Sequence, residues 1–329
     1  MGFTRRSVLG MGLGAVGSAL FVRRAAAAYS MQIMAPYYKS LVTMAPIAIA
    51  LEKGLYAKHG VDVTGVVTSV GGGTGLRNMM GADIGYAEMG TASVLLGFKA
   101  GIDARIVHDS VNTSEDIVWV TMPDSKIKTI KDLAGKRVGI SSPRSTSETL
   151  ALMAEEAAGM PGQMKLVAVG QIGAGLSALE NGGLDSMFIM EPLFTERAGK
   201  YRVVFTQKGL PRMSQDVGIA TTDFIKAHPE ELRGLIEGRR EAVDFLYGNI
   251  DEAAAITAKR YGDTLPADIA PKVMHHLAQL NYWSRGNIDL PSMQNVVNGL
   301  IRQGKWKGPV DWSKIVDRRF LPPDQQKDY

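Results

Sequence analysis

The hydrophobic pattern between residues 29 and 108 alternates short β-branched runs with segments of helical periodicity. Strands are expected at 31–36, 61–68, 83–89 and 104–108, and helices at 44–53 and 91–100. Thr43 is the expected N-cap of the first helix, and the Gly71–Gly75 loop leads into a short helix that ends at Gly81. Strands that alternate with helices in this way predict an α/β fold, in which a mostly parallel sheet carries helices on its faces.

The same alternation returns in the middle of the chain. Strands are expected at 137–141, 165–169 and 185–190, and helices at 146–158 and 176–181. Two segments are spelled alike, Gly73-x-Gly75-Leu76 and Gly173-x-Gly175-Leu176, which suggests a pseudo-repeat or a short chance match. From residue 222 the pattern turns helical, over 230–247, 250–261, 266–281 and 291–303, and this last third is expected to pack on the first lobe.

Residues 1–28 form a distinct leader. Arg5 and Arg6 are followed by a mildly apolar, glycine-rich stretch and then by Ala25–Ala28. This order resembles a twin-arginine export signal that is cleaved near Ala28, and it predicts a soluble periplasmic protein. The apolar stretch is shorter than the roughly 20 residues that span a bilayer, so a retained membrane anchor is the weaker alternative.

The charge balance follows from this leader. The chain has 329 residues and a net charge of +4, and residues 1–28 hold four arginines and no acid, which accounts for the whole excess. The neutral remainder offers no basic surface for a nucleic acid, so no nucleic-acid partner is expected. An acidic ligand would therefore need a local pocket.

The residue types present exclude several chemistries. The chain has no Cys, which removes thiol catalysis and Cys-ligated metal centres, and its five His are scattered without the spacing of a metal site. There is no G-x-x-x-x-G-K-[ST] and no G-x-S-x-G motif. No catalytic group, metal or cofactor is therefore expected, and the sequence favours a binding protein over an enzyme.

Candidate ligand contacts gather in loops that follow strands, where α/β sheets bind ligands. These loops are rich in small, hydroxyl-bearing or aromatic residues, and several precede helices whose free N–H groups suit an anionic group. They are residues 37–38, 71–75, 90–93, 141–147 and 191–192. Capping and turn formation explain any single loop equally well, so the argument rests on all five lying at one edge.

Four further segments carry a family resemblance. They are Ile49-Ala-Leu-Glu-Lys-Gly-Leu-Tyr56, Gly81-Ala-Asp-Ile-Gly85, Ile130-Lys-Asp-Leu-Ala-Gly-Lys-Arg-Val-Gly139 and Glu191-Pro-Leu-Phe194. With the loops above, they resemble the periplasmic solute-binding proteins for nitrate, sulfonates, taurine and thiamine-pyrimidine precursors. The resemblance implies a two-lobed, type II periplasmic-binding-protein fold, with a small organic anion bound in a cleft between the lobes and handed to an ABC permease and its ATPase.

The resemblance also implies which residues line the cleft. Carried over position by position, they are Tyr38, Gly73 and Thr91 from the first lobe, and Ser142, Arg144, Ser145 and Glu191 from the second. Met190 stands where family members often have an aromatic residue. Glu191 would either accept a hydrogen bond from the ligand or bond to backbone at the wall, and Arg77 and Lys39 are alternative partners for an anion.

The expected division of the chain has two crossings between lobes. Residues 29–115 and 220–329 would form the first lobe and residues 116–219 the second, with a hinge near Glu115 and Val217. The protein is expected to be a monomer. Two alternatives keep the same fold: an exported enzyme, or a receptor that presents its ligand to a membrane sensor.

Arg144 gives the sharpest prediction from sequence, because its guanidinium would lie beside the N-terminus of the helix expected at 146–158. Arg144→Ala should weaken binding of the co-purified ligand by about 10- to 150-fold and leave the fold intact, since a hydrogen bond to a charged group contributes about 1.5–3 kcal/mol. Titration calorimetry measures the change. A loss below about threefold would assign the anion to the helix N-terminus and the serines, and Arg144 to an ion pair with Glu148.

Overall fold

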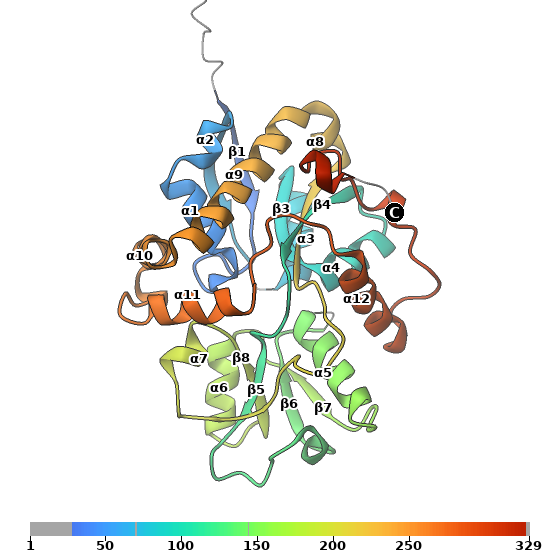
Figure 1. Ribbon diagram of the computed structural model, residues 1–329. Helices are drawn as coiled ribbons and strands as arrows, with labels where there is room; N and C mark the ends of the chain where they lie inside the picture. The colour runs from blue at the N-terminus through green and yellow to red at the C-terminus, as the bar shows by residue number, and fades with distance from the viewer. Residues whose placement is uncertain (1–27, 70, 144, 327–329) are drawn as a thin grey trace, which may run out of the picture.

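Two five-stranded sheets, one in each lobe, organise the chain (Figure 1). The computed structural model describes residues 28–326 apart from 70 and 144, so the leader and Arg144 lie outside the described residues. The strand order is β2-β1-β3-β10-β4 in the first sheet and β7-β6-β8-β5-β9 in the second. The strands are β1 (Tyr29–Met34), β2 (Val61–Val67), β3 (Tyr86–Gly90), β4 (Ala104–Val111), β5 (Val118–Thr121), β6 (Arg137–Ile140), β7 (Lys165–Ala168), β8 (Ser186–Ile189), β9 (Arg202–Phe205) and β10 (Asp216–Thr221).

The two sheets share one topology. In the first, β1 pairs in parallel with β2 and β3, and β10 runs antiparallel between β3 and β4. In the second, β6 pairs in parallel with β7 and β8, and β5 runs antiparallel between β8 and β9. The two Gly-x-Gly-Leu segments lie at corresponding places, in α3 (Gly72–Gly81) and α6 (Ile172–Glu180). The pseudo-repeat is therefore visible in the architecture.

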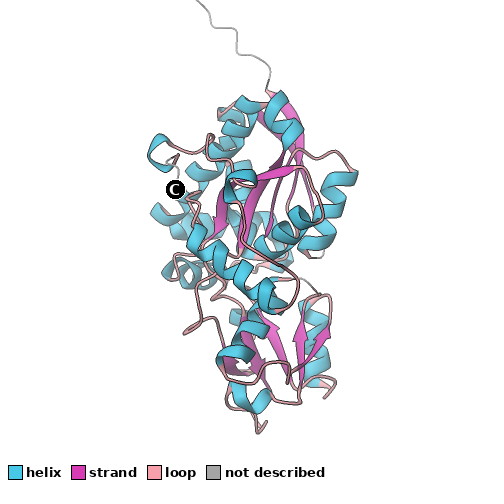
Figure 2. Ribbon diagram, turned by 90° about the vertical axis from the view of Figure 1, so that its right-hand side faces the viewer, coloured by secondary structure: helices cyan, strands magenta, loops and turns pink. Residues whose placement is uncertain are grey.

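Figure 2 shows the two lobes one above the other, each with strands of its own. The chain crosses between the lobes twice, after β4 and after β9. The hydrophobic pattern does not delimit the short strands β5, β9 and β10 beside these crossings. The second lobe's expected end at 219 falls inside β10, where Asp216–Ala220 pair with β3 of the first sheet. The second sheet is complete at Phe205, so the return to the first lobe comes earlier than the expected boundary.

Helices cover both sheets, and the C-terminal third packs on the first lobe as expected (Figure 1). Besides α3 and α6, the α-helices are α1 (Ala45–Glu52), α2 (Leu55–Lys58), α4 (Thr91–Lys99), α5 (Thr146–Ala157), α7 (Leu193–Glu196), α8 (Thr222–Ala227), α9 (Pro229–Gly248), α10 (Ile250–Tyr261), α11 (Ala270–Gln279) and α12 (Leu290–Arg302). In the first lobe α1 packs against α9 and α10, and α10 packs against α11.

Two details of the helix starts differ from the expectation. A 3-10 turn, Val42–Met44, precedes α1, so Met44 occupies the cap position and Thr43 does not cap. The buried Thr43 hydroxyl instead hydrogen-bonds to the Tyr282 hydroxyl at 3.1 Å. The second difference is that α3 begins at Gly72, so most of the expected glycine loop is the first turn of that helix.

The lobes share an apolar contact on one side. The hydrophobic core of the second lobe continues into the first through Leu95 of α4 and Leu300 of α12, which belong to one cluster with Leu150 of α5. A Cβ at Gly299 of α12 would lie 2.9 Å from Thr149 Cγ2, so the absence of a side chain there lets α12 approach α5 closely. The two lobes are thus packed together along α4, α5 and α12.

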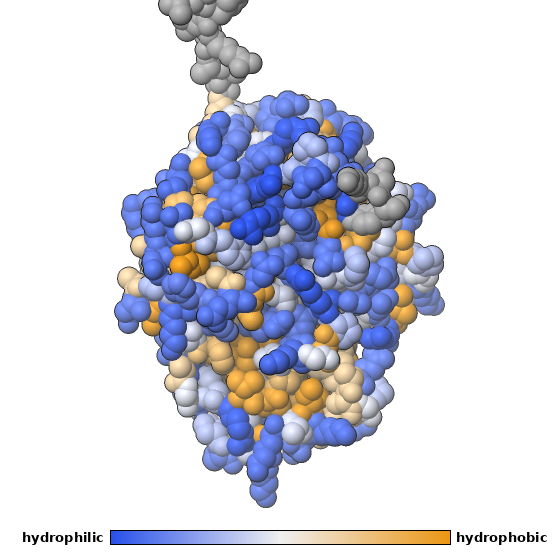
Figure 3. All heavy atoms as spheres, in the orientation of Figure 1, coloured by the Kyte–Doolittle hydropathy of each residue, from blue (hydrophilic) through white to orange (hydrophobic). Residues whose placement is uncertain are grey.

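The outer surface is mainly polar. Figure 3 shows hydrophilic residues over most of the upper lobe and apolar residues gathered near the middle of the lower lobe. In the described part of the chain, every helix is too short or too polar to serve as a membrane span.

Gly218 of β10 gives a test of this packing, because a Cβ there would lie 1.9 Å from Nε2 of the buried His108. His108 is held by the Tyr86 hydroxyl at 2.6 Å and by the Asp109 carbonyl at 2.9 Å, so its ring has no room to yield. Gly218→Ala should lower the free energy of unfolding by about 1–3 kcal/mol in urea denaturation. Gly81→Ala is the control, because nothing lies within 4 Å of its Cβ position. Equal stability of Gly218→Ala and the unaltered protein would contradict the packing described.

Candidate functional site

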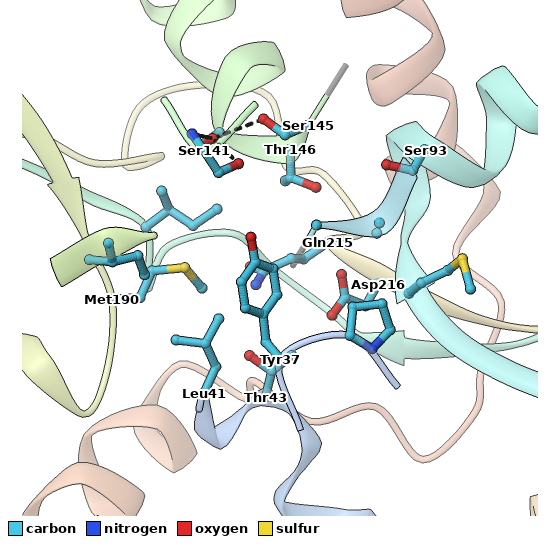
Figure 4. A pocket seen from close by; sticks show the side chains of 18 of the residues that line it. Tyr37, Leu41, Thr43, Ser93, Ser141, Ser145, Thr146, Met190, Gln215 and Asp216 are labelled. Atoms are coloured by element: carbon cyan, nitrogen blue, oxygen red, sulfur yellow. Dashed lines mark hydrogen bonds between the residues drawn. The ribbon is translucent and has the colours of Figure 1, made fainter. Parts of the chain in front are cut away.

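A cavity of about 80 Å³ lies between the lobes (Figure 4). The residues that follow β1, β6 and β8 line it, together with the end of β3 and the start of β10. By the space that a buried water needs, the cavity has room for about five to eight water-sized groups. It therefore suits a small ligand, enclosed by both lobes.

Part of the cavity lining is apolar. Leu41, Met44 and Met89 come from the first lobe, and Phe188 and Met190 come from the second. Met190 supplies a flexible thioether at the position where an aromatic residue was the family expectation. These side chains suit the uncharged part of a ligand, since apolar groups buried together leave water.

Four helices of nine or more residues begin at the cavity, α3 and α4 from the first lobe and α5 and α6 from the second. At α5, Ser145 caps the helix, because its Oγ accepts a hydrogen bond from the Glu148 backbone N–H at 3.1 Å. The hydroxyls of Ser141 and Ser145 lie 3.0 and 2.9 Å from Ser147 Oγ. Free N–H groups and positive helix ends from both lobes make this space favourable for a negative charge.

Tyr37 stands in the middle of the cavity (Figure 4). Its backbone φ is 60°, the left-handed region that a bulky residue adopts only when its surroundings impose it. Burial, with a smaller effect from the charge of Asp216, raises the pKa of the Tyr37 hydroxyl above its usual value. The hydroxyl therefore stays protonated and is available to donate a hydrogen bond.

Two carboxyl groups lie at the crossings between the lobes. Asp216 lines the cavity, and burial together with the charge of Glu88 raises its pKa to about 7. Burial likewise raises the pKa of Asp116 to about 7, although the Tyr282 hydroxyl donates to its Oδ2 at 2.8 Å. Among the described residues that line the cavity, none is Lys, Arg or His.

The expected first-lobe contacts lie beside the cavity rather than in its wall. Tyr38 is buried edge-on against Tyr261, with ring centroids 5.8 Å apart. Gly73 is exposed, and a Cβ added there would meet only Arg77 Nη1, at 3.9 Å. Thr91 is fully buried, and its N–H donates to the Gln215 carbonyl at 2.9 Å.

The expected second-lobe contacts divide. Ser145 lines the cavity, and Ser142 Oγ faces the first lobe, 3.6 Å from the Cβ position of Gly71. Glu191 is buried outside the cavity wall, where it accepts hydrogen bonds from Thr195 N at 3.0 Å and from Thr195 Oγ1 at 2.9 Å. The alternative cations Arg77 and Lys39 are exposed, and neither lines the cavity. Arg144 lies outside the described residues.

A family model described as "NMT1/THI5 like" matches residues 42–253, which is more than half of the chain. The chain belongs to the NMT1/THI5-like family. Among curated proteins, one of Brucella abortus (strain 2308) that is named as a binding protein is 26% identical over 301 residues, which cover 84% of this chain and 86% of that one. The family resemblance expected from the sequence motifs is therefore confirmed.

Solved structures share the fold of this NMT1/THI5-like protein. The aliphatic sulphonate binding protein SsuA of Escherichia coli matches with a TM-score of 0.72 and 18% identity, over 88% of this chain and 97% of that one. The nitrate-binding protein NrtA of Synechocystis PCC 6803 gives a TM-score of 0.70 and 19% identity, over 91% of each chain. The two-lobed, type II periplasmic-binding-protein fold is thereby confirmed.

Sequence reasoning missed several residues that line the cavity of this NMT1/THI5-like protein. Tyr37 and Gly72 are direct neighbours of expected contacts, and Ser93 lies two positions after one. The expected loops thus border the cavity, in part through neighbours of the residues singled out from the sequence. Gln215 and Asp216 carried no signal, because the pattern does not mark the start of β10.

A groove of about 240 Å³ lies beside the cavity on the side of α7. The cavity and the groove share Tyr37, Leu41 and Ile172, so these three side chains form the partition between them. The groove is bordered by Pro192 and Leu193 of the second lobe and by Thr264 of the first. The groove therefore lies on the surface between the two lobes, next to the cavity.

An ionisable pair joins the lobes at this side. His276 of α11 hydrogen-bonds through Nδ1 to Glu191 Oε1 at 2.8 Å, and the carboxylate is buried while the imidazole is half-buried. The hydrogen bond to Glu191 raises the pKa of His276 above its usual value. Because the pKa in the folded protein exceeds that of the unfolded chain, the stabilisation is complete below pH 6.5 and is lost as pH rises through the folded pKa.

His276→Gln tests this pair, because glutamine keeps a hydrogen-bond donor and removes the titrating charge. The melting temperature of the variant should fall furthest below that of the unaltered protein near pH 5.5, and the two should converge by pH 8.5. His275→Gln is the matched control, since His275 pairs with Asp251 at the surface and should change little at any pH. A His276→Gln deficit that does not vary with pH would exclude a charged contact between the lobes.

Proposed function

We propose that this protein is the substrate-binding component of an ABC importer, which captures a small organic anion between its lobes and delivers it to the permease and ATPase. The observation that carries the proposal is the convergence of four helix N-termini, two from each lobe, on one cavity lined by both lobes. Positive helix ends attract an anion, and a ligand held by both lobes favours the closed form over the open one. Binding and closure are thus the same event.

The family and the fold support this proposal. The structural neighbours include proteins for aliphatic sulphonates and for nitrate, and SsuA of Xanthomonas axonopodis pv. citri, bound to MOPS, matches with a TM-score of 0.75 and 17% identity over 89% of this chain and 99% of that one. The apolar side chains that line the cavity together with the serines favour an organic anion over an inorganic one. The resemblance of residues 1–28 to a twin-arginine export signal agrees with a receptor that meets its ligand in the periplasm.

The alternative of catalysis finds no support in the residues that line the cavity. A serine nucleophile needs a general base within hydrogen-bond reach. Ser141, Ser145 and Ser147, which line the cavity, are bonded to one another and to backbone N–H groups. Their pattern of partners is that of helix capping, which positions donors for a bound group.

A panel of short alkanesulfonates, alkanoates and nitrate, titrated by calorimetry, tests the proposal together with a pair of matched variants. Met190→Trp should weaken binding by more than tenfold, because Met190 lines the cavity and the larger indole occupies ligand space. Met80→Trp is the control, since Met80 is 42% exposed on the outer surface. Saturating ligand should also reduce the radius of gyration in small-angle scattering and raise the melting temperature.

Three outcomes would contradict the proposal. Equal affinities of Met190→Trp and Met80→Trp would place the ligand elsewhere. An unchanged scattering profile at saturation would exclude closure. A new product in mass spectra of the incubated panel would show that the protein is an enzyme.

A further inference from the structure

Asp216 is a buried carboxylate at the start of a strand that lines the cavity. It is the first residue of β10 and pairs with Gly90 of β3 and with Val111 of β4. Its exposed fraction is 9%, and the carboxylate points into the space bordered by Tyr37 and Thr146 (Figure 4). The register of the sheet, and not a mobile loop, therefore fixes this group in the lining of the cavity, beside the central Tyr37 (Figure 4).

The carboxylate of Asp216 has no hydrogen-bond donor in the part of the chain that the structure describes. Every other buried carboxylate there has one: Glu88 accepts from Arg239, Asp109 from Ser214, Asp116 from Tyr282, Glu155 from Met164 N, and Glu191 from Thr195. A buried carboxylate without a donor is costly, because it has lost water and gained nothing in exchange. Asp216 alone is left to be satisfied from the cavity.

The pKa of Asp216 also favours a ligand group that donates a hydrogen bond to this carboxylate. Burial and the neighbouring charge of Glu88 hold the pKa of Asp216 at about 7, so both the charged and the neutral form are present at neutral pH. A cationic or N–H group in the cavity would stabilise the charged form, because a hydrogen bond to an ionised group is stronger than one between neutral groups. A group that only accepts hydrogen bonds would meet a carboxylate that repels it.

The same cavity offers donors a short distance away. A Cβ at Gly90, immediately before α4, would lie 3.7 Å from Asp216 Oδ1 and 3.3 Å from Thr146 Oγ1 in the first turn of α5. The carboxylate and the positive helix ends therefore border the same small volume. A ligand that satisfies both must present a negative or accepting group and a donating group within a few bonds of each other.

We propose that Asp216 is a specificity-determining residue that selects anions which also carry an N–H donor, with a protonated amine as the best partner. The inference rests on the proposed function and narrows its substrate class. It assigns the two ends of the ligand: the anionic group faces the helix N-termini and hydroxyls, and the nitrogen faces Asp216. Acceptor-only anions, such as nitrate and simple alkanesulfonates, are then discriminated against.

Matched ligand pairs test the inference. Propanesulfonate is compared with 3-aminopropanesulfonate, and butanoate with 4-aminobutanoate, with propylamine as the amine that lacks an anionic group. The unaltered protein should bind the amino member of a pair about 10- to 150-fold more tightly, and Asp216→Asn should bring this ratio close to one. Asp223→Asn, at an exposed position of α8, is the matched control and should keep the ratio.

The ligand-free variants supply a readout that does not depend on the choice of ligand. Asparagine has the shape of aspartate without its charge, so Asp216→Asn should melt at the same or a higher temperature than the unaltered protein. A structural carboxylate would behave in the opposite way, because its loss would leave former donors unpaired. A clear fall in melting temperature on Asp216→Asn therefore overturns the assignment.

The binding results distinguish selection by Asp216 from anion binding in the cavity. Equal binding of both members of each pair, or an unchanged ratio in Asp216→Asn, overturns the selection by Asp216 and leaves an anion-binding cleft in place. Binding of propylamine with no binding of any anion supports Asp216 as the recognition group and overturns the proposed anion. Binding of none of the five compounds, with unchanged melting temperatures, counts against both.

Discussion

The antiparallel insertion of β10 between β3 and β4 is the constraint on which the site depends. Because β10 runs against its neighbours, its first residue lies beside the last residue of β3, as the pairing of Asp216 with Gly90 shows. The strand returning from the second lobe thus begins at the edge where the other strands end. One register places a connection between lobes, a buried carboxylate and the start of α4 in the same place.

The buried charged groups near this edge of the first sheet are of two kinds, paired and unpaired. Arg239 is 1% exposed and reaches Glu88 at 2.8 Å and the Ser284 carbonyl at 2.6 Å, so its charge is matched inside the protein. Removing one member of such a pair is far more damaging than the pair is stabilising. Asp216 differs, because no described residue donates a hydrogen bond to its carboxylate. The ion pair of Arg239 and Glu88 holds the strands together, whereas the Asp216 carboxylate is left to bond with a ligand, as we propose.

The sequence predicts the helices and the parallel strands well, because each has a strong period and a clear glycine or proline boundary. It does not predict β5 and β10, whose assignment depends on pairing with strands far away in the chain. The loops of the site are also predictable, whereas the residues within them are not. Tyr37 and Tyr38 differ by one position and point apart, and only the left-handed backbone at Tyr37 decides which one enters the cavity.

The contact between the lobes has two unlike sides. Along α4, α5 and α12 it is a buried apolar seam, in which Leu95, Leu150 and Leu300 meet. Beside α7 and α11 it is the polar pair of Glu191 and His276, next to the groove. Parting the seam would expose apolar surface to water, whereas parting the pair returns polar groups to it. Separating the lobes would therefore cost less free energy at the side of the groove, beside Tyr37, Leu41 and Ile172, than along α5 and α12.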